Sequence, residues 1–241
     1  LFYNRHLFYV HRRDFWLFIG SGMIGMTALS VFYNISVTKG SLALSAVLLA
    51  MSPVFVLFLA AIFFHEPVTR HKLTCVTLAL IGCVLVSGVL ESNGLSWSIT
   101  GILCGILASF FYAVYGIISK KVTQKGYHFL TITFYGTLFS GMTMLPFSNI
   151  HSLSSMIVSG QRTTFFILII HALVSSVLPY ALYSLSMRYM EAGKASILAS
   201  SEPAAAMLFG AVLYAETPGI LSICGLCFTI TAVILLNYER N

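Results

Sequence analysis

The sequence predicts an all-α polytopic membrane protein, and its composition and hydropathy pattern carry that prediction. The chain has 241 residues, of which 58% are apolar and 8% are charged, and its mean hydropathy is +0.92. A soluble domain carries about 25% charged residues, so there is too little charge here to cover a water-exposed surface. The apolar residues form long runs without strict alternation, which favours helices over a β-barrel. This composition excludes a soluble nucleic-acid-binding protein, a disordered chain and a disulfide scaffold.

Each predicted helix is an apolar run long enough to cross a bilayer, and only the run with Glu202 contains an acidic residue. A helical crossing needs roughly 20 apolar residues, because the hydrocarbon core is about 30 Å thick. The chain holds about eight such runs with short loops between them. In order, they are residues 15–37, 42–64, 73–90, 97–118, 127–147, 163–187, 195–215 and 219–237. The sequence therefore predicts a helical bundle with no soluble domain.

The positions of Lys and Arg predict how these spans are oriented, because cytoplasmic loops accumulate both residues. If residues 1–14 are cytoplasmic, the alternation of spans places only Lys39 and Arg162 on the outer side. The other eleven cations are then cytoplasmic: Arg5, Arg12, Arg13, Arg70, Lys72, Lys120, Lys121, Lys125, Arg188, Lys194 and Arg240. The net charge of +6 is thus explained by topology, and both termini of this chain are predicted to be cytoplasmic.

A weak internal repeat relates the two halves of the chain. A shift of 150 residues aligns residues 33–87 with 183–237 without a gap, and it pairs Pro53 with Pro203 and Glu66 with Glu216. The predicted topology puts the two glutamates on opposite faces of the membrane, so the copies are inverted. Inverted repeats with broken helices are typical of secondary transporters, whose substrate sites lie near the membrane midplane.

Four stretches carry a family resemblance: SLALSAVLLAMSPVFVLFLAAIFFHEPV and TCVTLALIGCVLVSG in the first copy, and YALYSLSMRYMEAGKASILASSEPAAAMLFGAVLYAE and GLCFTITAVILLN in the second. They resemble the EamA-like branch of the drug/metabolite transporter superfamily. The resemblance implies ten helices in two inverted five-helix repeats, with a central substrate cavity. Three helices of the first repeat would lie in residues 1–94 and five of the second in residues 95–241, so two further helices are expected before Leu1.

We therefore expect a secondary active transporter, a permease or exporter, of small metabolites such as amino acids, amines or drugs. Its partners would be a small-molecule substrate and the lipid bilayer, with a homodimer left open and neither cofactor, metal nor nucleic acid expected. The resemblance implies a bacterial inner (cytoplasmic) membrane. Two alternatives remain, a membrane-embedded enzyme and a non-transporting scaffold or receptor. Walker-type, HExxH and GxSxG sequences are absent, and a receptor has no need of inverted halves.

Two ionisable residues inside predicted spans are candidates for substrate binding or proton coupling. Glu202 is the only acidic residue well inside a span, where a charge is costly unless it is paired or faces a polar cavity. His171 lies in another span and titrates near neutral pH. Each could instead satisfy polar groups of a neighbouring helix.

Prolines and aromatic residues complete the candidate set. Pro53, Pro179 and Pro203 each interrupt a span and are expected to kink it. Ser201, a polar neighbour of Pro203, could satisfy the backbone groups that the kink frees or present them to substrate. A second group could line a cavity through aromatic faces and hydrogen-bonding tips: Asn34, Tyr112, Tyr115, Tyr180 and Tyr183. Packing is the alternative for each. The CxxC spacing of Cys224 and Cys227 is interpreted as small residues packing in a membrane helix.

Overall fold

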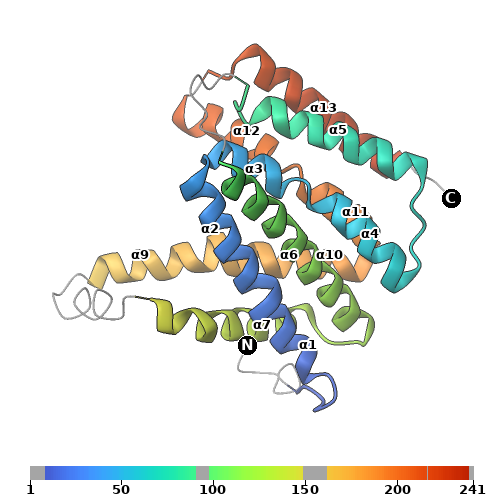
Figure 1. The fold of residues 1–241 in the computed structure, drawn as a ribbon, viewed down its shortest axis with the longest axis vertical. Helices are drawn as coiled ribbons and strands as arrows, with labels where there is room; N and C mark the ends of the chain where they lie inside the picture. Colours follow the sequence, from blue (N-terminus) through green and yellow to red (C-terminus); the bar gives the residue numbers. More distant parts are fainter. Residues whose placement is uncertain (1–8, 91–97, 149–161, 216, 239–241) are drawn as a thin grey trace.

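The computed structural model describes residues 9–90, 98–148, 162–215 and 217–238, and every regular element in these ranges is a helix (Figure 1). The first rod comprises α1 (Phe15–Ile19), the π-helical η2 (Gly20–Ala28) and α2 (Leu29–Lys39). It is followed by α3 (Leu42–Leu49) with α4 (Ser52–Phe64), by α5 (Arg70–Val86) and by α6 (Ile99–Gln124). Next come α7 (Phe129–Met144) with the 3-10 turn η3 (Leu145–Phe147), and α9 (Arg162–Ala172), η4 (Leu173–Val177) and α10 (Leu178–Tyr189) as one rod. The last two rods are α11 (Ala192–Ala199) with α12 (Glu202–Tyr214), and α13 (Ile220–Tyr238).

These rods confirm the predicted all-α polytopic membrane fold. Six rods within the described residues are long and apolar enough to cross a bilayer: Phe15–Lys39, Leu42–Phe64, Ile99–Gln124, Thr163–Tyr189, Ala192–Leu213 and Ile220–Tyr238. The remaining two, α5 and α7, have 17 and 16 residues. Two boundaries differ from the predicted runs by more than a turn, since α5 ends at Val86 rather than at residue 90 and α6 continues to Gln124 rather than stopping at residue 118. The two lysines that suggested a loop there remain helical, and Lys120 reaches carbonyl groups of another rod.

The helix boundaries repeat with the same shift of 150 residues that aligns the sequences. Both α4 and α12 begin one residue before a proline, Pro53 or Pro203, after a two-residue break in the rod. Both end at a residue in the left-handed region, His65 (φ 56°) and Ala215 (φ 54°). Non-glycine residues avoid that region unless the surrounding structure requires it. The two stretches therefore share a backbone plan that their few sequence identities understate.

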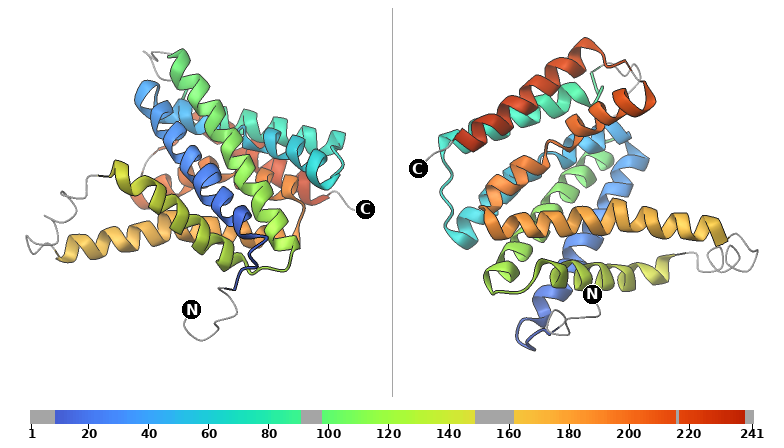
Figure 2. Two further views of the ribbon diagram at one scale, coloured as in Figure 1. Left: turned by 60° about the horizontal axis from the view of Figure 1, so that its bottom comes forward. Right: turned by 180° about the vertical axis from the view of Figure 1, so that it is seen from behind.

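The last helices of the two matched stretches, α5 and α13, lie side by side along one edge of the bundle (Figures 1 and 2). A methyl group on Gly82 would lie 2.8 Å from the Gly225 carbonyl oxygen, so the two backbones are in close contact. At one end of the pair, Nε2 of His71 lies 2.8 Å from the carbonyl oxygen of Leu235. Small residues thus permit the close approach expected of packed membrane helices.

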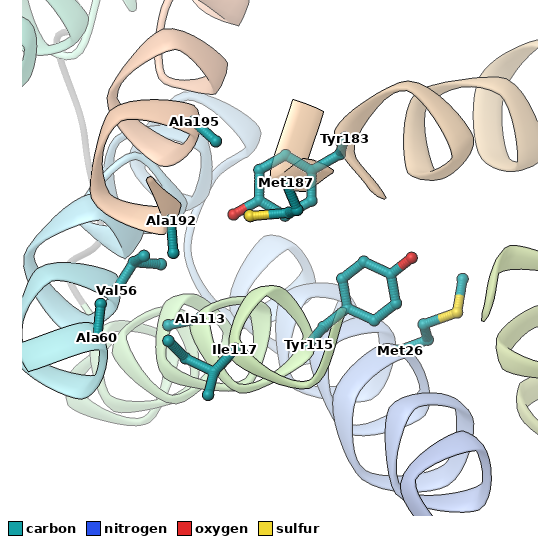
Figure 3. Packing of buried hydrophobic residues seen from close by; sticks show 10 residues of the cluster. All are labelled: Met26, Val56, Ala60, Ala113, Tyr115, Ile117, Tyr183, Met187, Ala192 and Ala195. Carbon is teal, nitrogen blue, oxygen red and sulfur yellow. The ribbon is translucent and has the colours of Figure 1, made fainter. Parts of the chain in front are cut away.

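α6 lies inside the bundle and packs against α2, α3, α4 and α10. Ten buried residues on five rods form the largest apolar cluster, which Figure 3 shows at close range: Met26, Val56, Ala60, Ala113, Tyr115, Ile117, Tyr183, Met187, Ala192 and Ala195. In contrast, α9 and α12 present large apolar side chains on the surface, including Phe166, Ile170 and Phe209. A buried polar and apolar interior surrounded by an apolar surface is suited to lipid.

Candidate functional site

A cavity of about 930 Å³ lies where the two broken rods meet. Its wall combines α3 and the start of α4 with the end of α11 and the start of α12, and α2 and α6 contribute Tyr33 and Tyr112. The cavity also reaches the ends of three rods, at Leu42, Ser87 and Gly219. Because successive rods cross the bundle in opposite directions, these three ends lie on the same side. The volume of the cavity is within the range of small-molecule sites, about 300–1,000 Å³.

The helix breaks leave backbone polar groups beside this cavity. Proline has no N–H, so Pro53 and Pro203 cannot donate the helical hydrogen bonds that the carbonyls of Leu49 and Ala199 would otherwise accept. Leu49 and Ala199 both line the cavity. Each half of the chain thus contributes to the same cavity one residue whose carbonyl group lacks its helical hydrogen-bond donor.

Glu202 is the charged residue of the cavity wall, since no other lining residue among those described carries a formal charge. It is the first residue of α12 and is exposed. No hydrogen bond or ion pair of its side chain occurs within the described residues. Its carboxylate lies within electrostatic reach of the phenol groups of Tyr33, Tyr112 and Tyr180.

The four tyrosines that the sequence analysis proposed as cavity residues lie close together, between the cavity wall and the apolar cluster. The ring of Tyr112, which lines the cavity, lies 5.2 Å from the ring of Tyr183, and the Tyr115 and Tyr180 rings are 5.1 Å apart. The Tyr115 hydroxyl lies 3.0 Å from Oγ of Ser184. The hydroxyl of Tyr183 is buried with no hydrogen-bond partner among the described residues.

The rod ends on the opposite side are joined by polar contacts across the two halves. Nζ of the fully buried Lys72 lies 2.5 Å from a carboxylate oxygen of Glu191, and it donates a 2.9 Å hydrogen bond to the Pro67 carbonyl. The Glu66 carboxylate accepts hydrogen bonds from the backbone N–H groups of Ala192 (3.1 Å) and Gly193 (3.3 Å). Glu66 therefore caps the N-terminus of α11, where helix N–H groups and the helix dipole favour an anion.

Lys120 adds a third polar contact at this end of the bundle, which lies opposite the cavity and is called the closed end below. Its ammonium donates to the carbonyls of Met187 (3.0 Å) and Met190 (2.6 Å) at the C-terminus of α10. A cation at that position is favoured by the helix dipole. In the sequence analysis, Lys72 and Lys120 indicated only which loops are cytoplasmic. The contacts of Glu66 and Glu191 were not predicted. The available signal for these polar contacts was the position of Lys72, just inside a helix that follows the loop with Glu66.

Several of the other sequence candidates lie outside the cavity. Asn34 is exposed and donates to the Ser30 carbonyl in its own helix (2.8 Å), and His171 is exposed on α9. Ser201 lines a smaller pocket of about 270 Å³ and donates to the Leu198 carbonyl (2.7 Å). Tyr183 packs against the lining residue Tyr112, and Tyr180 packs against Tyr115, but neither Tyr180 nor Tyr183 lines the cavity.

Pro179 and the cysteines have structural surroundings. Pro179 is the second residue of α10 and follows the π-helical turn η4, so it lies where the rod changes its hydrogen-bond pattern. None of the five cysteines, all of which the structure describes, forms a disulfide, and Cys224 and Cys227 are exposed. No cluster of three or more His, Cys, Asp or Glu residues able to hold a metal occurs in the part of the chain that the structure describes.

A separate polar contact joins α1 to the loop between α6 and α7, outside the membrane-spanning segments. Asp14 accepts hydrogen bonds from the Lys125 ammonium and from the Tyr127 hydroxyl, the latter at 2.8 Å. These hydrogen bonds lower the pKa of the Asp14 carboxyl below its ordinary value. The Tyr127 hydroxyl in turn accepts from the backbone N–H of His11 at 3.2 Å.

A helical membrane bundle with a cavity between two broken rods is an arrangement typical of membrane transporters. The EamA-like transporter family model matches residues 1–88 and 99–238, and the chain belongs to that family. It is an integral membrane protein of a transporter family, as expected from the resemblance.

Relatives and a solved structure agree with this assignment. An uncharacterized transporter of Archaeoglobus fulgidus is 24% identical over 91% of this chain and 76% of its own length. The uncharacterized inner membrane transporter YicL of Salmonella typhimurium is 22% identical (96% and 76%), and a probable amino-acid metabolite efflux pump of the same species is 26% identical (72% and 60%). A crystal structure superposes with a TM-score of 0.74 at 11% identity, covering 98% of this chain and 81% of the matched chain, which supports the fold.

Proposed function

We propose that the protein is a secondary active transporter that moves a small organic metabolite across the membrane by alternating access. The observation that carries this proposal is the cavity of about 930 Å³ between the matched helix breaks after Leu49 and Ala199. Discontinuous helices at the junction of two repeats are the usual setting of transporter substrate sites. The family membership and the transporter relatives support the same function.

In this proposal the structure is the conformation open on the side of Leu42 and Gly219. The opposite end is closed by the Lys72–Glu191 ion pair, the Glu66 cap on α11 and the contacts of Lys120. Alternating access requires these contacts to separate while the cavity mouth closes. The contacts are polar and reversible, so each can be exchanged for water when that end opens.

The cation asymmetry of the loops supports a cytoplasmic position for the closed end, so the cavity would face outward. The closed end includes Arg70 and Arg188, whereas Lys39 adjoins the cavity side. The YicL relative, an uncharacterized inner membrane transporter, supports the cytoplasmic membrane of a bacterium as the location. The efflux-pump relative supports small metabolites, such as amino acids, amines or drugs, as cargo.

Counterflow in proteoliposomes tests the transport function. The purified chain is reconstituted into vesicles preloaded with unlabelled amino acids, amines or drugs, and uptake of the matching labelled compound is followed with and without a proton gradient. We expect saturable uptake of at least one compound that exceeds uptake into protein-free vesicles. If no compound shows counterflow, the proposed function is wrong.

Cysteine labelling tests which side the cavity faces. Ala206 lines the cavity and is exposed, whereas Ala113 is fully buried. In a background with Cys224→Ala and Cys227→Ala, a membrane-impermeant maleimide added outside cells should label Ala206→Cys and leave Ala113→Cys unlabelled. Labelling of Ala206→Cys only from inside-out vesicles would reverse the proposed orientation.

A further inference from the structure

We infer that the cavity binds organic cations, amines that lack a carboxylate, in preference to zwitterionic amino acids, with Glu202 as the counter-charge. This inference rests on the proposed transport function and narrows its substrate class. It follows from the charge, the aromatic groups and the apolar wall of the cavity.

The charge of the cavity wall favours a cationic ligand. Glu202 is acidic, and no Lys, Arg or His lines the cavity among the described residues. Its carboxylate has neither an ion pair nor a hydrogen bond within the described part of the chain, although it stands at the membrane-embedded start of α12. A carboxylate removed from bulk water is stabilised by an ammonium group placed beside it. A bound amine would supply that partner.

Two tyrosines on the wall strengthen the case for an ammonium group. Tyr33 and Tyr112 line the cavity from different rods, and both phenol groups are within electrostatic reach of the Glu202 carboxylate. Aromatic faces attract ammonium groups, and phenol oxygens accept their hydrogen bonds. The carboxylate and both tyrosines therefore line one cavity that a cationic ligand can enter.

The rest of the wall is suited to an apolar ligand body. Leu42, Leu49, Val86 and Met207 line the cavity together with small alanines. Burying an aromatic or alkyl group against such a surface removes apolar area from water and so favours binding. The cavity thus matches an amphipathic amine with one charge at the helix break and an apolar group toward the wall.

A zwitterion fits this wall less well than an amine does. Its carboxylate would need a cationic or N–H-rich partner near Glu202, and the described lining offers no side-chain cation. Lys72 and Lys120 are held in contacts at the closed end of the bundle. A ligand carboxylate would instead add repulsion by Glu202 to the loss of its own hydration.

Four ligands of one shape test this preference in the unmodified protein. Phenethylamine and phenylalaninol carry a cation only, phenylalanine is a zwitterion, and 3-phenylpropionate is an anion. Binding to the protein in nanodiscs is measured by isothermal titration at pH 7. We expect the two cations to bind at least tenfold more tightly than phenylalanine, a difference of about 1.4 kcal/mol, and the anion to bind most weakly. Equal affinities for phenethylamine and phenylalanine would overturn the inference.

Substitution of Glu202 tests its role as the counter-charge. Glu202→Gln should lower the affinity for phenethylamine at least tenfold, whereas Glu202→Asp should retain most of it. Asp14→Asn removes a carboxylate outside the cavity and should leave the affinity unchanged. Thermal unfolding of each variant establishes that it is folded. Retention of amine affinity in folded Glu202→Gln would contradict the inference.

The two proposals fail in different ways. Counterflow of phenylalanine without any preference for phenethylamine would leave a transporter and remove the inference about its substrate class. Tight, Glu202-dependent binding of phenethylamine without counterflow of any compound would keep the binding site and remove the transport function.

Discussion

The ammonium of Lys72 and the carboxylate of Glu191, which lie 2.5 Å apart, join the first turn of α5 to the N-terminus of α11. Lys72 is 1% exposed, whereas the side chain of Glu191 is 40% exposed. The two halves of the bundle are therefore tied at one end through a cation that water does not reach and an anion that it does.

Removing one partner of this pair should destabilise the protein through the charge left behind. We expect Glu191→Gln to lower the free energy of unfolding by about 1–3 kcal/mol, less than the 3–5 kcal/mol of a fully buried pair because Glu191 is partly hydrated. The replacement of both residues, with Lys72→Met, should cost less than the sum of the single changes. Denaturant unfolding in detergent measures the cycle. Additive effects would show that the pair is not coupled, and exposed Lys121→Met is the control.

Glu66 should stabilise the protein as a cap of α11. Glu66→Ala leaves the N–H groups of Ala192 and Gly193 without their acceptor, so we expect a loss of about 0.5–2 kcal/mol. Glu66→Gln keeps one acceptor oxygen and should lose less. Hydrogen exchange of the first amides of α11 should accelerate in the alanine variant. Unchanged exchange at Ala192 and Gly193 would refute the capping role.

The close approach of α5 and α13 predicts opposite effects at two glycines. A methyl group on Gly82 would lie 2.3 Å from Oγ1 of Thr229 and 2.8 Å from the Gly225 carbonyl oxygen, so Gly82→Ala should destabilise the bundle by about 1–3 kcal/mol. Gly141, in α7, has no such neighbour within 4 Å. Gly141→Ala should therefore be neutral or stabilising by up to about 1 kcal/mol. Melting temperatures in one detergent compare them, and equal shifts would contradict this packing.

The contact of Asp14 with Lys125 and Tyr127 should make stability depend on pH. The folded protein holds the pKa of this carboxyl below its ordinary value, near 3.9 in unfolded chains. Its contribution is therefore present above that pH and is lost as the pH falls through the folded-state pKa. Melting temperatures of the wild-type protein and Asp14→Asn should differ at pH 7 and converge toward pH 3. A difference that persists unchanged at pH 3 would exclude this contact as the cause.

The breaks in the two rods are the part of the fold that the sequence predicts best, because Pro53 and Pro203 act locally. The left-handed turns at His65 and Ala215 have no such signal, since neither residue is a glycine. The π-helical turns η2 and η4 likewise follow from packing rather than from any residue type. Tertiary contacts over-determine the backbone at these positions.

The candidate site was predictable where one residue type is rare. Glu202 stands out because acidic residues are scarce within spans, and the structure places it on the cavity wall. Asn34 and His171 could not be assigned to a face, because membrane helices are apolar on all sides and periodicity does not separate lipid from interior. The closed end depends on partners far apart in sequence, such as Lys72 and Glu191, so no local pattern reveals it.

At each break the proline leaves one carbonyl group without its helical N–H donor, at Leu49 and at Ala199, and both residues line the cavity. Side-chain replacement at these two positions leaves the carbonyl oxygens in place, so an alanine scan of the wall would understate how polar the cavity is. Replacing the imino acid instead, as in Pro203→Ala, returns an N–H donor to the Ala199 carbonyl. Substitution of Pro203 can thus change the selectivity for cargo although it adds no side-chain functional group. A comparison of polar side chains between relatives would overlook such a change.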